Sequence, residues 1–166
     1  MRIENAKIVG IDPGKSGGIA YVNANDVIVA EPFGKTEGDI LNQLRAVIAP
    51  KTKVYLGQVG GYAGRSLPGS AMFNFGRNYG FLIGVLMERE ARVSLVTPQR
   101  WQKTLGAGTR GERTRDKWKL HLKGLAQLSF PGLSTISLAT SDALLILKYA
   151  MIQESISHHA VVQLPA

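Results

Sequence analysis

The sequence predicts an α/β fold in which helices flank a mixed five-stranded sheet. Two observations lead to this class. Short β-rich runs alternate with segments of helical periodicity, and the order is three strands, helix, strand, helix, strand and then three helices. The 166 residues suffice for one domain with its own hydrophobic core but not for two of ordinary size. We expect a single domain over residues 1–156 and a frayed tail over residues 157–166.

The first part of the chain predicts three antiparallel strands, because three apolar, β-rich runs are separated by two turn sequences. The runs cover residues 7–12, 19–22 and 27–33. The turns between them, residues 13–18 and 23–26, are rich in Gly, Pro, Asn and Asp.

The rest of the chain predicts two more strands, placed among five helices. A glycine-rich stretch, residues 57–69, is expected to be a loop. Gly76, Gly80 and Gly84 recur along one helix face, so we expect this face to approach another backbone, within the chain or in a dimer. The predicted strands cover residues 54–56 and 93–96, and the predicted helices cover residues 39–48, 70–90, 98–105, 112–129 and 138–155.

The positive charge of the chain is concentrated in one segment. The whole sequence has 20 Lys and Arg residues against 12 Asp and Glu residues, a formal net charge of +8. Residues 89–123 hold ten basic and three acidic residues, so +7 of this charge lies there. Such a block is typical of a surface that binds a polyanion, most often nucleic acid, although a solvated helix face that only aids solubility has the same composition.

Several classes of chemistry and location are excluded by composition. The chain has no cysteine, so any metal must bind through oxygen or imidazole. No apolar run reaches the roughly 18 residues that span a bilayer, and the first residues lack the pattern of a secretory signal. We expect a cytoplasmic protein without a membrane partner.

Two aspartates stand where a carboxylate can take part in chemistry. Asp12 ends the first strand, so its side chain is expected at the rim of the sheet, although an Asx-type turn would also explain it. Asp142 begins the apolar last helix, where a first-turn acid interacts favourably with the helix dipole and Ser141 would act as the cap. If the two carboxylates meet, they repel each other unless a divalent cation such as Mg²⁺ or Mn²⁺ lies between them.

Six short motifs follow one another along the chain: GIDPGKSGGIAYV, VYLGQVGGYAG, FNFGRNYG, VTPQRWQ, LSFP and SDALLI. Together they resemble the RuvC-type Holliday-junction resolvases, in particular the bacteriophage and related short forms. The resemblance implies a ribonuclease-H-like fold, a homodimer, and Mg²⁺-dependent paired nicking of four-way DNA junctions, with Mn²⁺ as a substitute. It also implies a location at the nucleoid or in a phage-infected bacterial cell.

The same resemblance assigns metal ligands to this chain. Asp12 matches the first metal-binding aspartate of the family, and Asp142 matches the one that opens the final helix. The second acidic ligand is replaced, because Gly57 stands where the family has a glutamate; a shift of one residue would place Gln58 there, with an amide oxygen but no charge. Little or no cleavage is therefore expected. The chain is an engineered junction-trapping variant, a natural member that binds without cutting, or a slow enzyme that uses Gln58 and water.

Two lysines are candidates for a position near the scissile phosphate. Lys117 and Lys119 match the family's active-site lysines in region. Residues two apart lie on opposite sides of a helix, so the pattern does not tell which one faces the site. Solvated surface charge is the alternative role of each.

Junction DNA is expected to be bound through its shape and its phosphates. Tyr62, Phe73 and Phe75 are candidates for stacking on unstacked bases, with core packing as the alternative for the two phenylalanines. The candidates for phosphate contacts are Arg65, Arg77, Arg100, Lys103, Arg110, Arg113 and Arg115.

A non-catalytic branched-DNA-binding protein is the rival function. A sugar-kinase or actin-like ATPase is excluded, because that class needs two domains around the nucleotide and 166 residues are too few for both.

Overall fold

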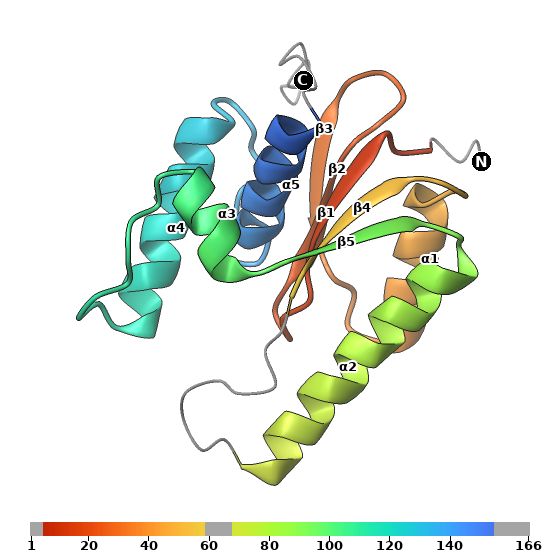
Figure 1. Ribbon diagram of the computed structural model, residues 1–166, viewed down its shortest axis with the longest axis horizontal. Helices are drawn as coiled ribbons and strands as arrows, with labels where there is room; N and C mark the ends of the chain where they lie inside the picture. Colours follow the sequence, from red (N-terminus) through yellow and green to blue (C-terminus); the bar gives the residue numbers. More distant parts are fainter. Residues whose placement is uncertain (1–4, 59–67, 155–166) are drawn as a thin grey trace.

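Five strands form one mixed sheet in the order β3-β2-β1-β4-β5. The computed structural model describes residues 5–58 and 68–154 of the chain (Figure 1). The first three strands form an antiparallel meander, whereas the fourth pairs in parallel with the first, and the fifth in parallel with the fourth. The predicted sheet is therefore confirmed. The strands are β1 (Ile8–Asp12), β2 (Gly18–Val22), β3 (Ile28–Pro32), β4 (Lys53–Gly57) and β5 (Arg92–Val96).

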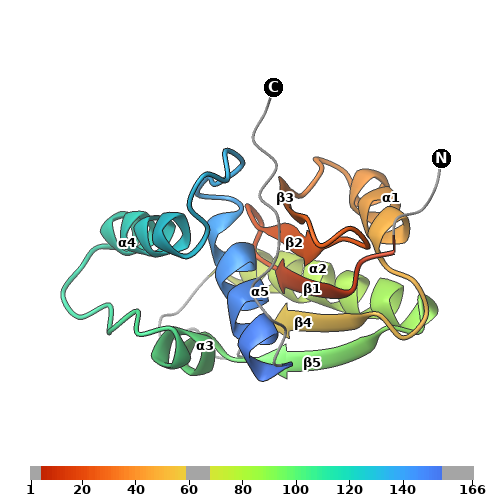
Figure 2. The ribbon, with the colours of Figure 1, turned by 90° about the horizontal axis from the view of Figure 1, so that it is seen from above.

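Helices cover both faces of the sheet, and their order along the chain is the predicted one. Figures 1 and 2 show the last three helices on one side of the sheet and the first two on the other. Two hydrophobic cores result, one on each face, because alternate side chains of a strand point to opposite faces. The helices are α1 (Glu37–Val47), α2 (Gly69–Glu88), α3 (Pro98–Thr104), α4 (Arg115–Ser129) and α5 (Ser141–Gln153).

The last helix, α5, lies so close to the central strand β1 that there is no room for a side chain at their contact. A methyl group at Gly10, in β1, would lie 2.5 Å from the backbone nitrogen of Leu147 and 2.7 Å from the carbonyl oxygen of Ala143. Both contacts are far shorter than a carbon atom permits, so glycine is required at this position. The close approach brings the N-terminus of α5 to the C-terminal end of β1.

Two helices begin three residues later than the periodicity predicts. The side chain of Thr114 accepts a hydrogen bond from the Lys117 amide at 3.3 Å, which caps α4 and makes Arg115 its first residue. Before α5, the amide of Ser137 donates to the hydroxyl of Thr140 at 2.8 Å, so these residues form a turn instead of helix. The expected role of Ser141 as cap is wrong, because Thr140 holds that position and the Ser141 hydroxyl donates to the Ser137 carbonyl.

The N-terminal half of α2 projects beyond the sheet (Figure 1). A methyl group at Gly76, Gly80 or Gly84 would meet no atom within 4 Å. Close intramolecular packing of this glycine face is therefore wrong within the described residues. Phe73 is 71% exposed, so its packing in the core is wrong as well.

Two remaining expectations concern the C-terminal tail and the membrane. The tail predicted for residues 157–166 lies outside the described residues. Among the helices that the structure describes, none has the length and apolar character needed to cross a membrane.

Candidate active site

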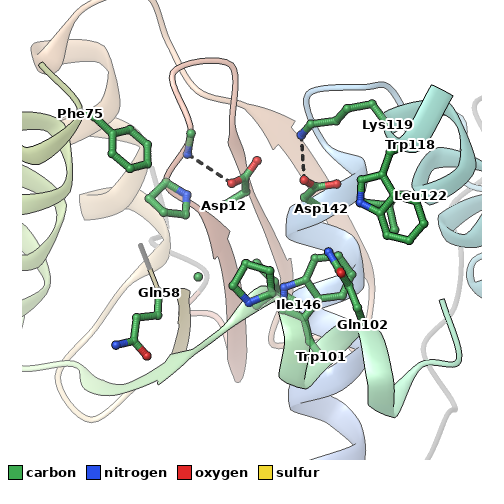
Figure 3. A pocket seen from close by; sticks show the side chains of 14 residues that line it. Asp12, Gln58, Phe75, Trp101, Gln102, Trp118, Lys119, Leu122, Asp142 and Ile146 are labelled. Atoms are coloured by element: carbon green, nitrogen blue, oxygen red, sulfur yellow. Dashed lines mark hydrogen bonds and ion pairs between the residues drawn. The ribbon is translucent and has the colours of Figure 1, made fainter. Parts of the chain in front are cut away.

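A pocket of about 330 Å³ lies at the C-terminal ends of β1 and β4, beside the first turn of α5 (Figure 3). Asp12 and Asp142 both line it, together with Lys119. In open sheets that contain parallel strands, this edge is where ligands usually bind. The two aspartates, which are far apart in sequence, are thus brought into one site.

Strand register explains why Asp12 and Gly57 share the pocket. Ile11 is paired with Leu56 in the parallel β1–β4 ladder, so the next residues of the two strands are neighbours as well. Both Ile11 and Leu56 belong to the core on the α1 and α2 side. The alternation of a strand then places Asp12 and Gly57 on the opposite face, which α5 covers.

Burial and charge both act on the Asp12 carboxylate. Its pKa is raised to about 6, first by burial and then by the neighbouring Asp142 carboxylate, while Lys119 and a hydrogen bond from the Gly14 amide oppose the rise. The two carboxylates line the same pocket, where their like charges repel each other. The protein therefore holds two acids in an arrangement that favours a bound cation.

Lys119 already supplies one positive charge to this site. Its Nζ atom donates to Oδ2 of Asp142 at 2.7 Å, and the two side chains are 31% and 15% exposed. Trp118 and Leu122 are buried, and they fix which side of α4 faces α5. Lys117 lies on the exposed side of α4 and does not line the pocket.

The strand β4 contributes no charge to the pocket. Gly57 faces it without a side chain, whereas the Gln58 side chain is exposed and points away from the two aspartates (Figure 3). A Cβ atom at Gly57 would lie 3.0 Å from Cδ of Pro13 and 3.3 Å from Cδ1 of Ile146. Any larger residue at position 57 thus requires a small shift of these neighbours.

The residues present fit a bound divalent cation. Oδ1 of Asp142 is buried and has no hydrogen-bond partner among the described residues, which is costly for a carboxylate oxygen unless a ligand satisfies it. Mg²⁺ and Mn²⁺ prefer oxygen ligands, and Mg²⁺ is commonly held by one or two carboxylates with water and substrate phosphate completing its shell. No cluster of three or more acidic or histidine residues occurs within residues 5–58 and 68–154. Asp12 and Asp142 would be the protein ligands.

The DNA-binding candidates fall into four groups. Phe75 lines the pocket, whereas Phe73 lies on the surface of α2. Some arginines have protein partners: Arg77 is paired with Glu37 at 2.7 Å, and the guanidinium groups of Arg110 and Arg113 donate to backbone carbonyls. Arg100, Lys103 and Arg115 are exposed on α3 and α4, and Tyr62 and Arg65 lie outside the described residues.

Part of the pocket wall was not identified from the sequence as functional. Trp101 and Gln102 of α3 line the pocket, and so does Trp118 of α4 (Figure 3). The two tryptophans are buried and belong to the core on the α5 side. Apolar character favours burial, but only the tertiary packing of α3 and α4 beside α5 brings the two tryptophans to the site.

The fold is similar to that of a solved nuclease structure. The structure of Thermus thermophilus RuvC in complex with a Holliday junction substrate is 16% identical, with a TM-score of 0.55, and the match covers 91% of this chain and 96% of that one. A second Thermus thermophilus RuvC structure is also 16% identical, with 89% and 95% covered and a TM-score of 0.48. No protein-family model and no curated protein matches the chain. The first of these likenesses confirms the ribonuclease-H-like fold.

Proposed function

We propose that this chain is a structure-specific DNA endonuclease that binds four-way junctions as a homodimer and resolves them by Mg²⁺-dependent paired nicking. Its cleavage is impaired, because Gly57 leaves a ligand position empty. The observation that carries the proposal is the convergence of Asp12 and Asp142 on one pocket of a fold shared with a junction-bound RuvC. The place of action is the bacterial cytoplasm, where branched DNA is found.

Each residue of the pocket has a chemical role in this proposal. Asp12 and Asp142 would hold a divalent ion, and this ion would supply Lewis-acid stabilisation of the charge that develops on the scissile phosphate. Lys119 is directed into the same pocket and offers its ammonium group to a phosphate oxygen. Trp101 and Trp118 form an apolar wall that excludes bulk water and strengthens these electrostatic interactions.

The basic residues beside the pocket provide the surface for the DNA backbone. Arg100 and Lys103 on α3 and Arg115 at the start of α4 are exposed, and they lie on the two helices that supply Trp101 and Trp118 to the pocket. Phosphate contacts of this kind position a duplex without reading its sequence. Phe75, at the rim of the pocket, is the candidate for stacking on an unpaired base.

The dimer is proposed on the basis of α2. Its surface exposes Phe73 and Met87, each 71% accessible, and the open glycine positions leave room for a second backbone. A resolvase needs two active sites to make two symmetric nicks, which one such pocket per chain provides only in a dimer. Light scattering at micromolar concentration should give twice the mass of the chain.

The cleavage experiment uses a labelled four-way junction with Mg²⁺ or Mn²⁺. The wild-type chain should bind the junction and nick it slowly or not at all. Gly57→Glu combined with Ile146→Val should produce paired nicks, because the glutamate supplies the missing carboxylate and valine removes the Cδ1 atom that crowds position 57. The rate gain is expected to be about 100-fold or more.

A matched control separates charge from shape. Gly57→Ala with Ile146→Val adds the same Cβ atom at position 57 but no carboxylate, so it should remain as slow as the wild type. Asp12→Asn, added to the restored protein, should abolish nicking while junction affinity is kept. If the junction is bound by all variants and cut by none, the chain is a non-catalytic branched-DNA-binding protein. If none binds it, both functions are wrong.

A further inference from the structure

We propose that the Lys119 ammonium occupies the second cation position of this centre, so that the centre binds one divalent ion instead of two. The inference rests on the proposed metal-dependent function and concerns how that site is charged. It starts from the contact between Nζ of Lys119 and Oδ2 of Asp142, at 2.7 Å, inside the pocket that both aspartates line.

The charges of the described residues favour a single divalent ion. Asp12 and Asp142 bring two negative charges, and Lys119 brings one positive charge. One divalent ion leaves the centre with a single positive charge, which one substrate phosphate neutralises. A second divalent ion would leave two uncompensated positive charges in a partly buried site, where charges a few ångströms apart repel strongly.

The oxygen atoms of Asp142 are divided in the way this proposal requires. Oδ2 is bonded to Lys119, whereas Oδ1 is buried with no hydrogen-bond partner among the described residues. Oδ1 is therefore the atom left for a metal ion. A centre with two divalent ions would need a further carboxylate, and Gly57 supplies none.

The packing of α4 keeps the ammonium in place. Trp118 and Leu122 are buried in the core on the α5 side, so the adjacent Lys119 stays directed at the first turn of α5. The lysine is 31% exposed, and Asp142 is only 15% exposed, so the ion pair is partly shielded from water. An ion pair in such surroundings is screened less than one on the surface.

The test measures Mn²⁺ binding to the DNA-free protein by isothermal titration calorimetry, with Mn²⁺ electron paramagnetic resonance as an independent count. The wild-type chain should bind one Mn²⁺. Lys119→Met, which keeps the unbranched aliphatic stem but removes the ammonium group, should bind Mn²⁺ about tenfold or more tightly, because the ammonium no longer repels the ion or occupies Asp142. Lys119→Arg keeps the charge and should retain the wild-type affinity.

Lys117→Met is the matched control, because Lys117 has the same charge two residues away on the exposed side of α4. Its affinity should stay within about twofold of the wild type, since a solvent-exposed charge is largely screened. Circular dichroism checks that each variant is folded.

The possible results separate this inference from the function on which it rests. Two Mn²⁺ ions in the wild type would overturn the inference and leave the metal-dependent nuclease standing. Unchanged affinity in Lys119→Met, or an equal gain in Lys119→Arg, would overturn the role of the ammonium charge. If neither the wild type nor Lys119→Met binds Mn²⁺, both the inference and the proposed metal centre are wrong.

Discussion

The glycines on the two faces of the sheet differ in the space that surrounds them. On the face covered by α5, a methyl group at Gly10 would lie 2.5 Å from the backbone of the helix, so there is no space for it. On the other face, α2 carries three glycines at which a methyl group would touch none of the described residues within 4 Å. The close packing of α5 on β1 therefore fixes the positions of Asp12 and Asp142, whereas the glycine face of α2 is open to another molecule.

The largest expected effect is on the salt dependence of junction binding, which tells whether DNA binds on the side of α3 or on the side of α2. Junction affinity should fall by about 10³-fold or more between 50 and 200 mM salt, because phosphate contacts release counterions. Replacing Arg100 and Lys103 of α3 by alanine should lower the salt slope by about two, one for each lost phosphate contact. Replacing Arg77 of α2, which is paired with Glu37, should change it less. Fluorescence anisotropy over a salt series measures these slopes, and a flat response would show that the basic block is not the phosphate surface.

The next effect concerns the close contact beneath the site. Gly10→Ala should destabilise the protein by about 3 kcal/mol or more, because α5 must move away from β1 to admit the methyl group. The same movement displaces Asp142 from Asp12, so metal affinity should decrease as well. Urea unfolding measures the first effect. A variant as stable as the wild type would mean that α5 does not pack on β1 at this distance.

A smaller effect follows from the charge of Asp12. An aspartate in an unfolded chain titrates near pH 3.9, whereas the raised pKa of Asp12 in the metal-free fold is about 6. The folded state therefore binds this proton more tightly, and the contribution of Asp12 to stability falls as pH rises from about 4 to about 6. Asp12→Asn removes this penalty and should stabilise the metal-free protein at pH 7 by about 1–2 kcal/mol, after allowance for partial exposure.

The same variant should have little effect at pH 4, where the Asp12 carboxyl is protonated in the folded state. Urea titrations in the presence of a chelator compare the two pH values. Equal stabilisation at pH 4 and pH 7 would show that the cause is not the buried charge.

The smallest effect is expected on the open face. Gly80→Ala and Gly84→Ala should each stabilise the chain by about 0.5–1 kcal/mol, because alanine favours helix and the added methyl group meets no neighbour in residues 5–58 and 68–154. Thermal melts at low protein concentration measure this gain. Destabilisation by either change at low concentration would indicate a close intramolecular contact on the glycine face.

The sequence predicted the elements of the fold well, and their exact limits less well. Alternating apolar runs and turn residues identified all five strands, because each strand has its own local pattern. The predicted starts of α4 and α5 were too early, because side-chain hydrogen bonds determine where these two helices begin. Thr114 caps α4, and the turn between Ser137 and Thr140 delays α5. Periodicity carries no information on such bonds.

The candidate site was predicted through its two aspartates, which the structure brings together. The choice between Lys117 and Lys119 required the phase of α4, which depends on the burial of Trp118 and Leu122 against α5. Gln102 and Trp101 were not predicted as site residues, because only the packing of α3 beside α5 makes this short helix part of the pocket wall. Local patterns identify chemical groups, whereas the tertiary fold decides which of them face one another.

Diffraction at the manganese edge from crystals of the wild-type chain with a four-way junction would show directly whether the two aspartates share an ion. We expect one anomalous peak per chain, in contact with the carboxylates of Asp12 and Asp142 and next to a DNA phosphate. A peak at another place, or bound DNA with no ion at these carboxylates, would contradict a metal-dependent site at this edge of the sheet.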